Sequence, residues 1–258
     1  MMMSRRTALF LFLASFIIFA VLLMPVSIVL AMTGLNNKIS YSNSTGSIFS
    51  MGFSDLSAGG VYIGDVEFSP TISAILFGDI VGNIKFSGLQ RQGDFGFSFD
   101  GNDVLSFEEL HLLTPIALQT RIGNSEGLLR LHSEKADISL TNGCYFGTFT
   151  LTTTALDDLF RLANIPAPEI SGQGVCRIGG MIDVNLKGQT QELSLEVSGN
   201  VASNQDWSKP VVGLAAVIEP PAGRTFAANI KQLFETAGLS PAGRGYRLSL
   251  TSGAAGNS

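Results

Sequence analysis

The chain has 258 residues, of which 45% are hydrophobic and only 14% are charged, and its formal net charge is −5. Soluble domains usually contain about 25% charged residues, and nucleic-acid binding needs clustered basic side chains. These values exclude a strongly basic, nucleic-acid-binding protein. The 29 glycines, with many Ser, Thr and β-branched residues, indicate instead a sheet-rich body with many turns.

Residues 8–31 form an apolar run without Asp, Glu, Lys, Arg or His, and 16 of the 24 side chains are Leu, Ile, Phe or Val. A helix of this length spans roughly 36 Å, which is enough to cross a bilayer. Arg5 and Arg6 precede the run, so the positive-inside rule places residues 1–7 in the cytoplasm and the remainder on the other side. The alternatives are a cleaved secretory signal ending near Ala31 and a buried core helix, but the length of the run favours a retained anchor.

After this transmembrane anchor, the sequence predicts a connector over residues 32–45, one β-rich domain over 46–251 and a flexible tail over 252–258. Short apolar–polar alternations, separated by Gly, Asn, Asp and Ser, are typical of half-buried antiparallel strands joined by short loops. We therefore expect a mainly β fold, with a curved, mostly antiparallel meander sheet. The predicted strands cover residues 46–52, 61–68, 80–86, 93–99, 116–122, 128–131, 136–140, 176–187, 193–201, 211–218 and 246–251, with a polar break at 132–135.

Two short accessory helices are predicted outside the anchor. The first begins with a capping box at Thr154 and runs to about Ile165, with Asp157 and Asp158 near its positive end. The second covers residues 225–237, where apolar side chains recur at helical spacing and a glycine follows.

Cys144 and Cys176 are the only cysteines, and both lie in the part of the chain that we expect to be exported. An even pair of cysteines in an oxidising compartment favours a disulfide. Closing a loop of this length would stabilise the fold by roughly 3–4 kcal/mol on the chain-entropy account. The alternative is two separate buried thiols.

The sequence is poor in groups that carry catalysis, since His111 and His132 are its only histidines. His132 and Cys144 could form a nucleophile–base pair in an anchored periplasmic hydrolase, but a turn histidine and a disulfide explain the same residues better. Two Cys and two His also lack zinc-site spacing, and the glycine-rich segments lack a phosphate-loop lysine. We therefore expect no enzymatic activity, no cofactor and no metal site.

Several segments occur in a recognisable order along the chain. After the anchor these are residues 46–52, 62–70, 76–80, 143–147, 174–180 and 238–248. This order resembles type II secretion system protein N, the small inner-membrane subunit of the general secretory pathway with one transmembrane helix. The family often has Trp where this chain has Phe49 and Phe68, and the only Trp here is Trp207. An exchange between aromatic residues keeps a large core side chain.

The resemblance implies a non-catalytic platform component that helps a type II secretion system export folded proteins across the outer membrane. Its implied location is the bacterial inner membrane, with the C-terminal domain in the periplasm, and its implied partners are other inner-membrane platform proteins and the secretin. An exposed sheet edge suits this role because it can accept a strand from a partner. The alternative is a membrane-anchored periplasmic lipid-handling scaffold, whose curved sheet would hold acyl chains against apolar residues such as those at 116–122.

Overall fold

The computed structural model describes most of the chain after the predicted anchor. The described residues are 24–25, 27–28, 39–58, 61–71, 79–99, 101, 103–120, 123–139, 141–162, 164–202 and 211–252. Arg5, Arg6 and most of the predicted anchor at 8–31 lie outside these ranges. Within them, no helix is both long enough and apolar enough to span a membrane.

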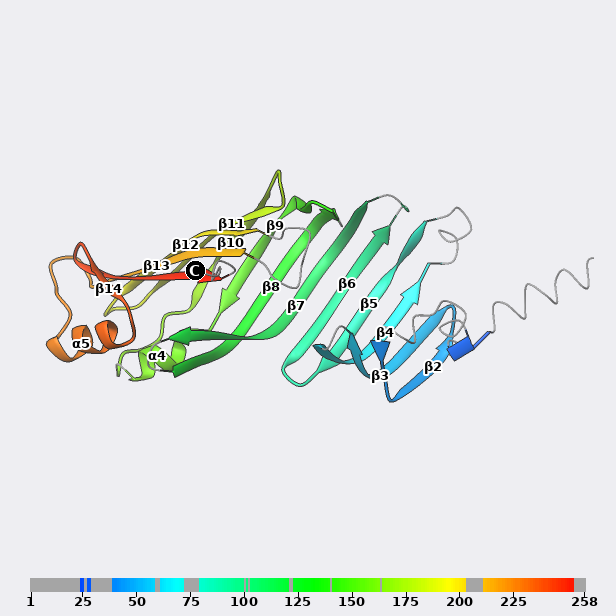
Figure 1. Cartoon of the computed structure of the whole chain (residues 1–258), viewed down its shortest axis with the longest axis horizontal. Helices are drawn as coiled ribbons and strands as arrows, with labels where there is room; N and C mark the ends of the chain where they lie inside the picture. The colour runs from blue at the N-terminus through cyan, green and yellow to red at the C-terminus, as the bar shows by residue number, and fades with distance from the viewer. Residues whose placement is uncertain are drawn as a thin grey trace, which may run out of the picture. The chain divides into compact units, whose positions relative to one another are not determined.

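The described residues form fifteen β-strands and the two short helices α4 and α5. The strand pairings are antiparallel, and from β3 to β5 and from β6 to β13 each strand lies next to the strands that precede and follow it in the chain, which confirms the predicted mainly β meander. The chain divides between Leu89 and Gln90 into two compact units. Figure 1 shows the strands of the second unit lying side by side in chain order from β6 to β13.

The first unit is a small antiparallel sheet. Its strands are β1 (Ile39–Ser40), β2 (Asn43–Ser47), β3 (Ser50–Ala58), β4 (Val61–Pro70) and β5 (Ile80–Gly88). The prediction of one strand over residues 46–52 is wrong, because the chain reverses there and Ser47 pairs with Ser50. The Phe49 N–H donates to Ser47 Oγ at 3.3 Å, so a serine side chain stabilises a turn whose two central residues, Ile48 and Phe49, are apolar.

The second unit carries the longest strands and both helices. The strands are β6 (Arg91–Phe99), β7 (Val104–Thr120), β8 (Gly123–Ser139), β9 (Gly143–Thr153), β10 (Ile170–Arg177), β11 (Met181–Gln189), β12 (Ser194–Ala202), β13 (Val211–Glu219), β14 (Ser240–Ala242) and β15 (Gly245–Ser252). The helices are α4 (Asp157–Leu162) and α5 (Ala228–Thr236). Strand β15 pairs with β13 on one side and with the short β14 on the other.

Two strand predictions in this unit need correction. The predicted polar break at 132–135 is wrong, because β8 continues through it. Ser133 is fully buried there, and its hydroxyl donates to the Thr148 carbonyl at 2.9 Å, where the pairing with β9 shifts register. The single strand predicted over 176–187 is also wrong, because Gly179 and Gly180 adopt φ values of 93° and 78° and turn the chain between β10 and β11.

Helix α5 confirms the second predicted helix and covers part of the inner face of the sheet. Phe234 is fully buried, and its ring contacts Phe226 and Tyr246 at centroid distances of 5.4 Å each. Gly238 has φ +94°, and the Leu239 N–H donates to the Phe234 carbonyl at 2.9 Å. This is the glycine-dependent ending expected after a helix.

Asp103, just before β7, holds the turn between β8 and β9. Its carboxylate accepts hydrogen bonds from Ser139 Oγ, from Thr141 Oγ1 at 2.8 Å and from the Thr141 N–H at 3.1 Å. These hydrogen bonds, the one from Ser139 foremost, lower the pKa of Asp103, while desolvation opposes them. The ionised carboxylate therefore fixes the start of β7 to the neighbouring turn.

We expect Asp103→Asn to lower the free energy of unfolding at neutral pH, because the amide cannot replace a carboxylate that accepts three hydrogen bonds. The folded-state pKa of Asp103 lies below its ordinary value of 3.8. The stabilisation is therefore complete above that value and is lost as the pH falls through the lowered pKa. Urea unfolding should separate wild type and variant at about pH 7 and bring them together near about pH 2. An equal difference at both pH values would contradict the assignment.

Candidate functional site

Strands β7 to β9 sort apolar and polar side chains onto two faces. Leu112, Leu131 and Leu151 are direct cross-strand neighbours, and they contribute to the apolar inner face. The neighbouring cross-strand pair, His111 and His132, belongs to the opposite, outer face. Because successive side chains of a strand alternate between faces, one sheet provides two surfaces of different chemistry.

The inner face holds an apolar cleft of about 350 Å³. Its lining residues are Ile116, Leu129, Leu131, Phe149, Leu151, Thr153, Ala155, Leu156, Ile170, Ile182, Val184, Leu186, Val197, Val201, Leu214, Ala216 and Leu248. Ile116 on β7 and Leu248 on β15 are seven strand spacings apart, which in a flat sheet would be roughly 34 Å. The sheet therefore curls, so that strands distant in pairing order line the same cleft.

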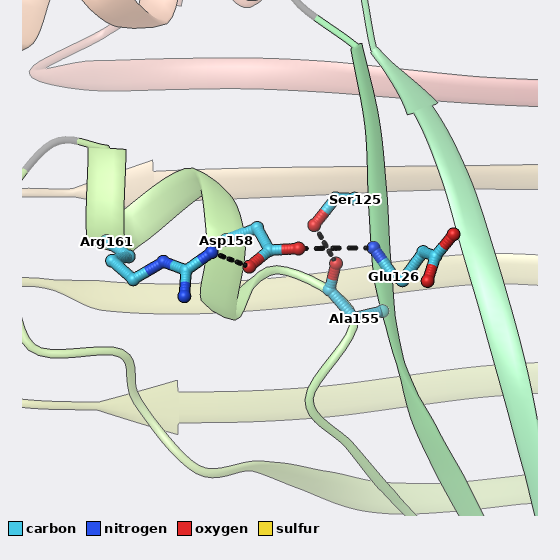
Figure 2. Close-up of polar contacts among 5 residues, drawn as sticks. All are labelled: Ser125, Glu126, Ala155, Asp158 and Arg161. Carbon is cyan, nitrogen blue, oxygen red and sulfur yellow. Dashed lines mark hydrogen bonds and ion pairs between the residues drawn. The ribbon is translucent and has the colours of Figure 1, made fainter. Parts of the chain in front are cut away.

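The segment that leads into α4 contributes Ala155 and Leu156 to the lining of the cleft. Ser125 Oγ donates to the Ala155 carbonyl at 2.6 Å, and the Glu126 N–H donates to Asp158 Oδ2 at 3.4 Å. Asp158 also forms an ion pair of 2.7 Å with Arg161 (Figure 2). These contacts hold the α4 segment against β8 and so set the position of Ala155 in the lining.

The predicted capping box at Thr154 is wrong, because the Thr154 side chain bonds to β8 instead of capping α4. Thr154 Oγ1 accepts the Leu128 N–H at 2.9 Å, and the Thr154 N–H donates to the Leu128 carbonyl at 3.1 Å. The residue thus extends the contact with β8, and α4 begins only at Asp157. Burial, and after it the negative charge of Asp158, raises the pKa of Asp157.

The outer face holds a shallower pocket of about 450 Å³ over β6 to β9, and its lining includes both polar and apolar residues. The His111 and His132 rings stack there with centroids 4.4 Å apart and Nδ1 atoms 3.1 Å apart, and Asp94 lies opposite His111 in the sheet register. Two imidazoles leave a zinc ion two ligands short of a tetrahedral site. Among the described residues, no group of three or more His, Cys, Asp or Glu side chains could hold a metal ion.

The predicted disulfide between Cys144 and Cys176 is present, and the Cα atoms are 5.5 Å apart. Cys144 is 1% exposed and forms an isolated β-bridge with Gly180. The disulfide thus joins the start of β9 to the end of β10. A Cys144 nucleophile activated by His132 is excluded, because the sulfur is already bonded.

The sequence predicted the disulfide, and its lipid-handling alternative expected an apolar inner face on a curved sheet, but it did not predict the stacked histidines as a site. The apolar residues at 116–122 were the one signal toward the cleft, since Ile116 lines it. Both sites depend on cross-strand register, and register is not readable from a single strand pattern. Comparison with known protein families, with curated proteins and with solved structures finds no match to this chain.

We expect the paired substitution Cys144→Ser and Cys176→Ser to lower the free energy of unfolding by about 3–4 kcal/mol, because the unfolded chain regains the freedom of a loop with 32 residues of separation. Urea unfolding without reductant measures the change. The same experiment on wild type with reductant serves as a control, and it should reproduce the loss. A wild type insensitive to reductant would contradict the prediction.

We expect Gly127→Ala to lower the free energy of unfolding by about 1–3 kcal/mol. A Cβ at Gly127 would lie 2.5 Å from the backbone N and Cα of Ala155, so the α4 segment would have to move away from β8. Gly213→Ala is the matched control, because its Cβ would meet only Asn200, with the side-chain Oδ1 at 3.3 Å and the backbone oxygen at 3.9 Å. Thermal and urea unfolding should show the loss for Gly127→Ala alone, and equal losses for both variants would refute it.

Proposed function

We propose that this protein is a non-catalytic inner-membrane subunit of a type II secretion system. In this proposal, residues 8–31 anchor the chain, and residues 46–251 act in the periplasm by binding other platform proteins. The observation that carries the proposal is the contact between two segments on which the family resemblance depends, 143–147 and 174–180. The Cys144–Cys176 disulfide joins them, and such a bond persists in an oxidising compartment such as the periplasm.

The C-terminal strand offers a means of binding a partner. Strand β13 pairs with Tyr246–Ser252 of β15, whereas β14 pairs only with Gly245–Arg247 on the other side. No strand among the described residues pairs with the outer edge of residues 248–252. An open edge of this kind can accept a strand from another protein through backbone hydrogen bonds.

The register of β15 identifies the groups that such a partner would meet. A two-residue turn joins β14 to β15, and Ala242 and Gly245 face each other across it. In this hairpin the flanking residues exchange hydrogen bonds, and the pattern alternates along the strand. The Arg247 N–H therefore points toward β14, and the Ser249 N–H points to the open edge. The Ser249 side chain is exposed.

The test is recovery of platform proteins with the tagged full-length chain after crosslinking in cells. We expect wild type and Ser249→Ala to recover other inner-membrane components of the secretion system. Ser249→Pro should recover several-fold less, because proline removes the outward N–H while leaving the bonds to β13 in place.

The outcomes separate the function from the binding edge. If wild type recovers no secretion-platform protein, the proposed function is wrong. If Ser249→Pro recovers as much as Ser249→Ala, the function stands and the β15 edge is not the binding site. Genes for a secretin and a secretion ATPase beside this reading frame would provide independent support.

A further inference from the structure

We propose that the apolar cleft of the second unit binds one acyl chain of a membrane phospholipid. The proposal goes beyond a role in secretion, and it shares with the proposed function only the anchor at 8–31. The cleft is defined by its side chains on β7 to β13, on β15 and on the segment before α4.

The lining of the cleft offers nothing to a polar ligand. Of its lining residues, only Thr153 has a polar side chain, and Thr153 Oγ1 already accepts the Ala155 N–H at 3.1 Å. Backbone groups of the lining strands are engaged in the antiparallel ladders. A water molecule in a cavity needs two to four polar partners, so a cleft with this lining favours hydrocarbon over water.

The volume of the cleft matches a single hydrocarbon chain. A space of about 350 Å³ lies at the lower end of the range for small-molecule sites. It accommodates roughly twelve methylene-sized groups, if each takes about 30 Å³, close to the share of one water molecule in the liquid. This is most of one phospholipid acyl chain.

A peptide segment fits the same space poorly. One turn of an α-helix, with a diameter of about 10 Å, fills roughly 420 Å³, so a helix cannot be buried whole in a cleft of about 350 Å³. An extended peptide would bring N–H and C=O groups into a lining that has no partner for them, and each unpaired group is costly. An acyl chain has no such groups, so it is the occupant that this chemistry selects.

The anchor determines the source of the chain. Residues 8–31 are expected to cross a bilayer, and they precede in the same chain the unit that holds the cleft, which begins at Gln90. The cleft is thereby tethered beside a membrane, where phospholipid acyl chains are the most abundant hydrocarbon. Free fatty acid is the competing source.

The experiment uses the full chain reconstituted into vesicles of phosphatidylethanolamine and phosphatidylglycerol. A small fraction of the phospholipid carries a photoactivatable diazirine on its acyl chain, and labelled peptides are located by mass spectrometry after irradiation. We expect labels on cleft residues such as Leu131, Leu151 and Val184, in addition to labels on the anchor. If the labels in the wild-type protein are restricted to the anchor, this result alone overturns the proposal.

Two variants on β12 test the site directly. Val201→Trp places a large side chain in the cleft and should reduce cleft labelling by about tenfold, because it occupies the space of the acyl chain. Asn200→Trp is the matched control, since this neighbouring residue points to the opposite face and is absent from the lining. Both variants should keep the labelling of the anchor. Undiminished cleft labelling in a folded Val201→Trp protein would overturn the site.

A further arm separates the two sources of the chain. The full-length protein is labelled in vesicles that contain diazirine-bearing palmitate in place of the labelled phospholipid. Labelling of the cleft by the phospholipid supports the proposal. Labelling by the free fatty acid alone would contradict the proposal that the acyl chain belongs to a phospholipid. These results do not depend on secretion partners, so failure of the proposed function and failure of the acyl-chain site remain distinguishable.

Discussion

A single sheet with one apolar face must cover that face without a second sheet, and this constraint governs the second unit. The alternation along β7 to β9 places leucines on the inner face and histidines on the outer face. Exposed to water, the inner face would lose the free energy that burial supplies, about 25 cal/mol for each Å² of apolar surface. The curl of the sheet and the two helices are the two ways in which the fold meets this requirement.

The helices cover the inner face unequally, and this leaves the cleft. Phe160 of α4 and Phe234 of α5 are fully buried, and they pack in one cluster with Leu193 and Ile218 of the sheet region. Ile182, Val201 and Leu214 belong to the margin of the same cluster and are only partly buried. The cleft is thus the part of the inner face that the helices do not reach.

Much of the fold follows from local patterns in the sequence, whereas the sites depend on register. Period-two alternation predicted the antiparallel meander, and the glycine after residue 237 predicted the end of α5. Three of the errors fall where a polar side chain makes a contact that no local pattern predicts. Ser47 stabilises a turn inside a predicted strand, and buried Ser133 keeps β8 continuous through a polar stretch. Thr154 matched a helix-capping pattern but bonds to β8, because a contact 26 residues away in sequence uses its hydroxyl. Such long-range competition is not encoded in any local window.

The order of pairing has a consequence for how the chain acquires its structure. From β6 to β13 each strand pairs with the one synthesised just before it, so no strand has to wait for a distant segment before it can join. The sheet can therefore form progressively as the chain emerges from its N-terminus, with one strand added at a time. The last strand differs, because α5 lies between β13 and β15 in the chain, so β15 can pair with β13 only after the α5 segment has been synthesised. If synthesis stopped before residue 240, β13 would consequently remain an unpaired edge strand that could pair with a strand of any neighbouring chain.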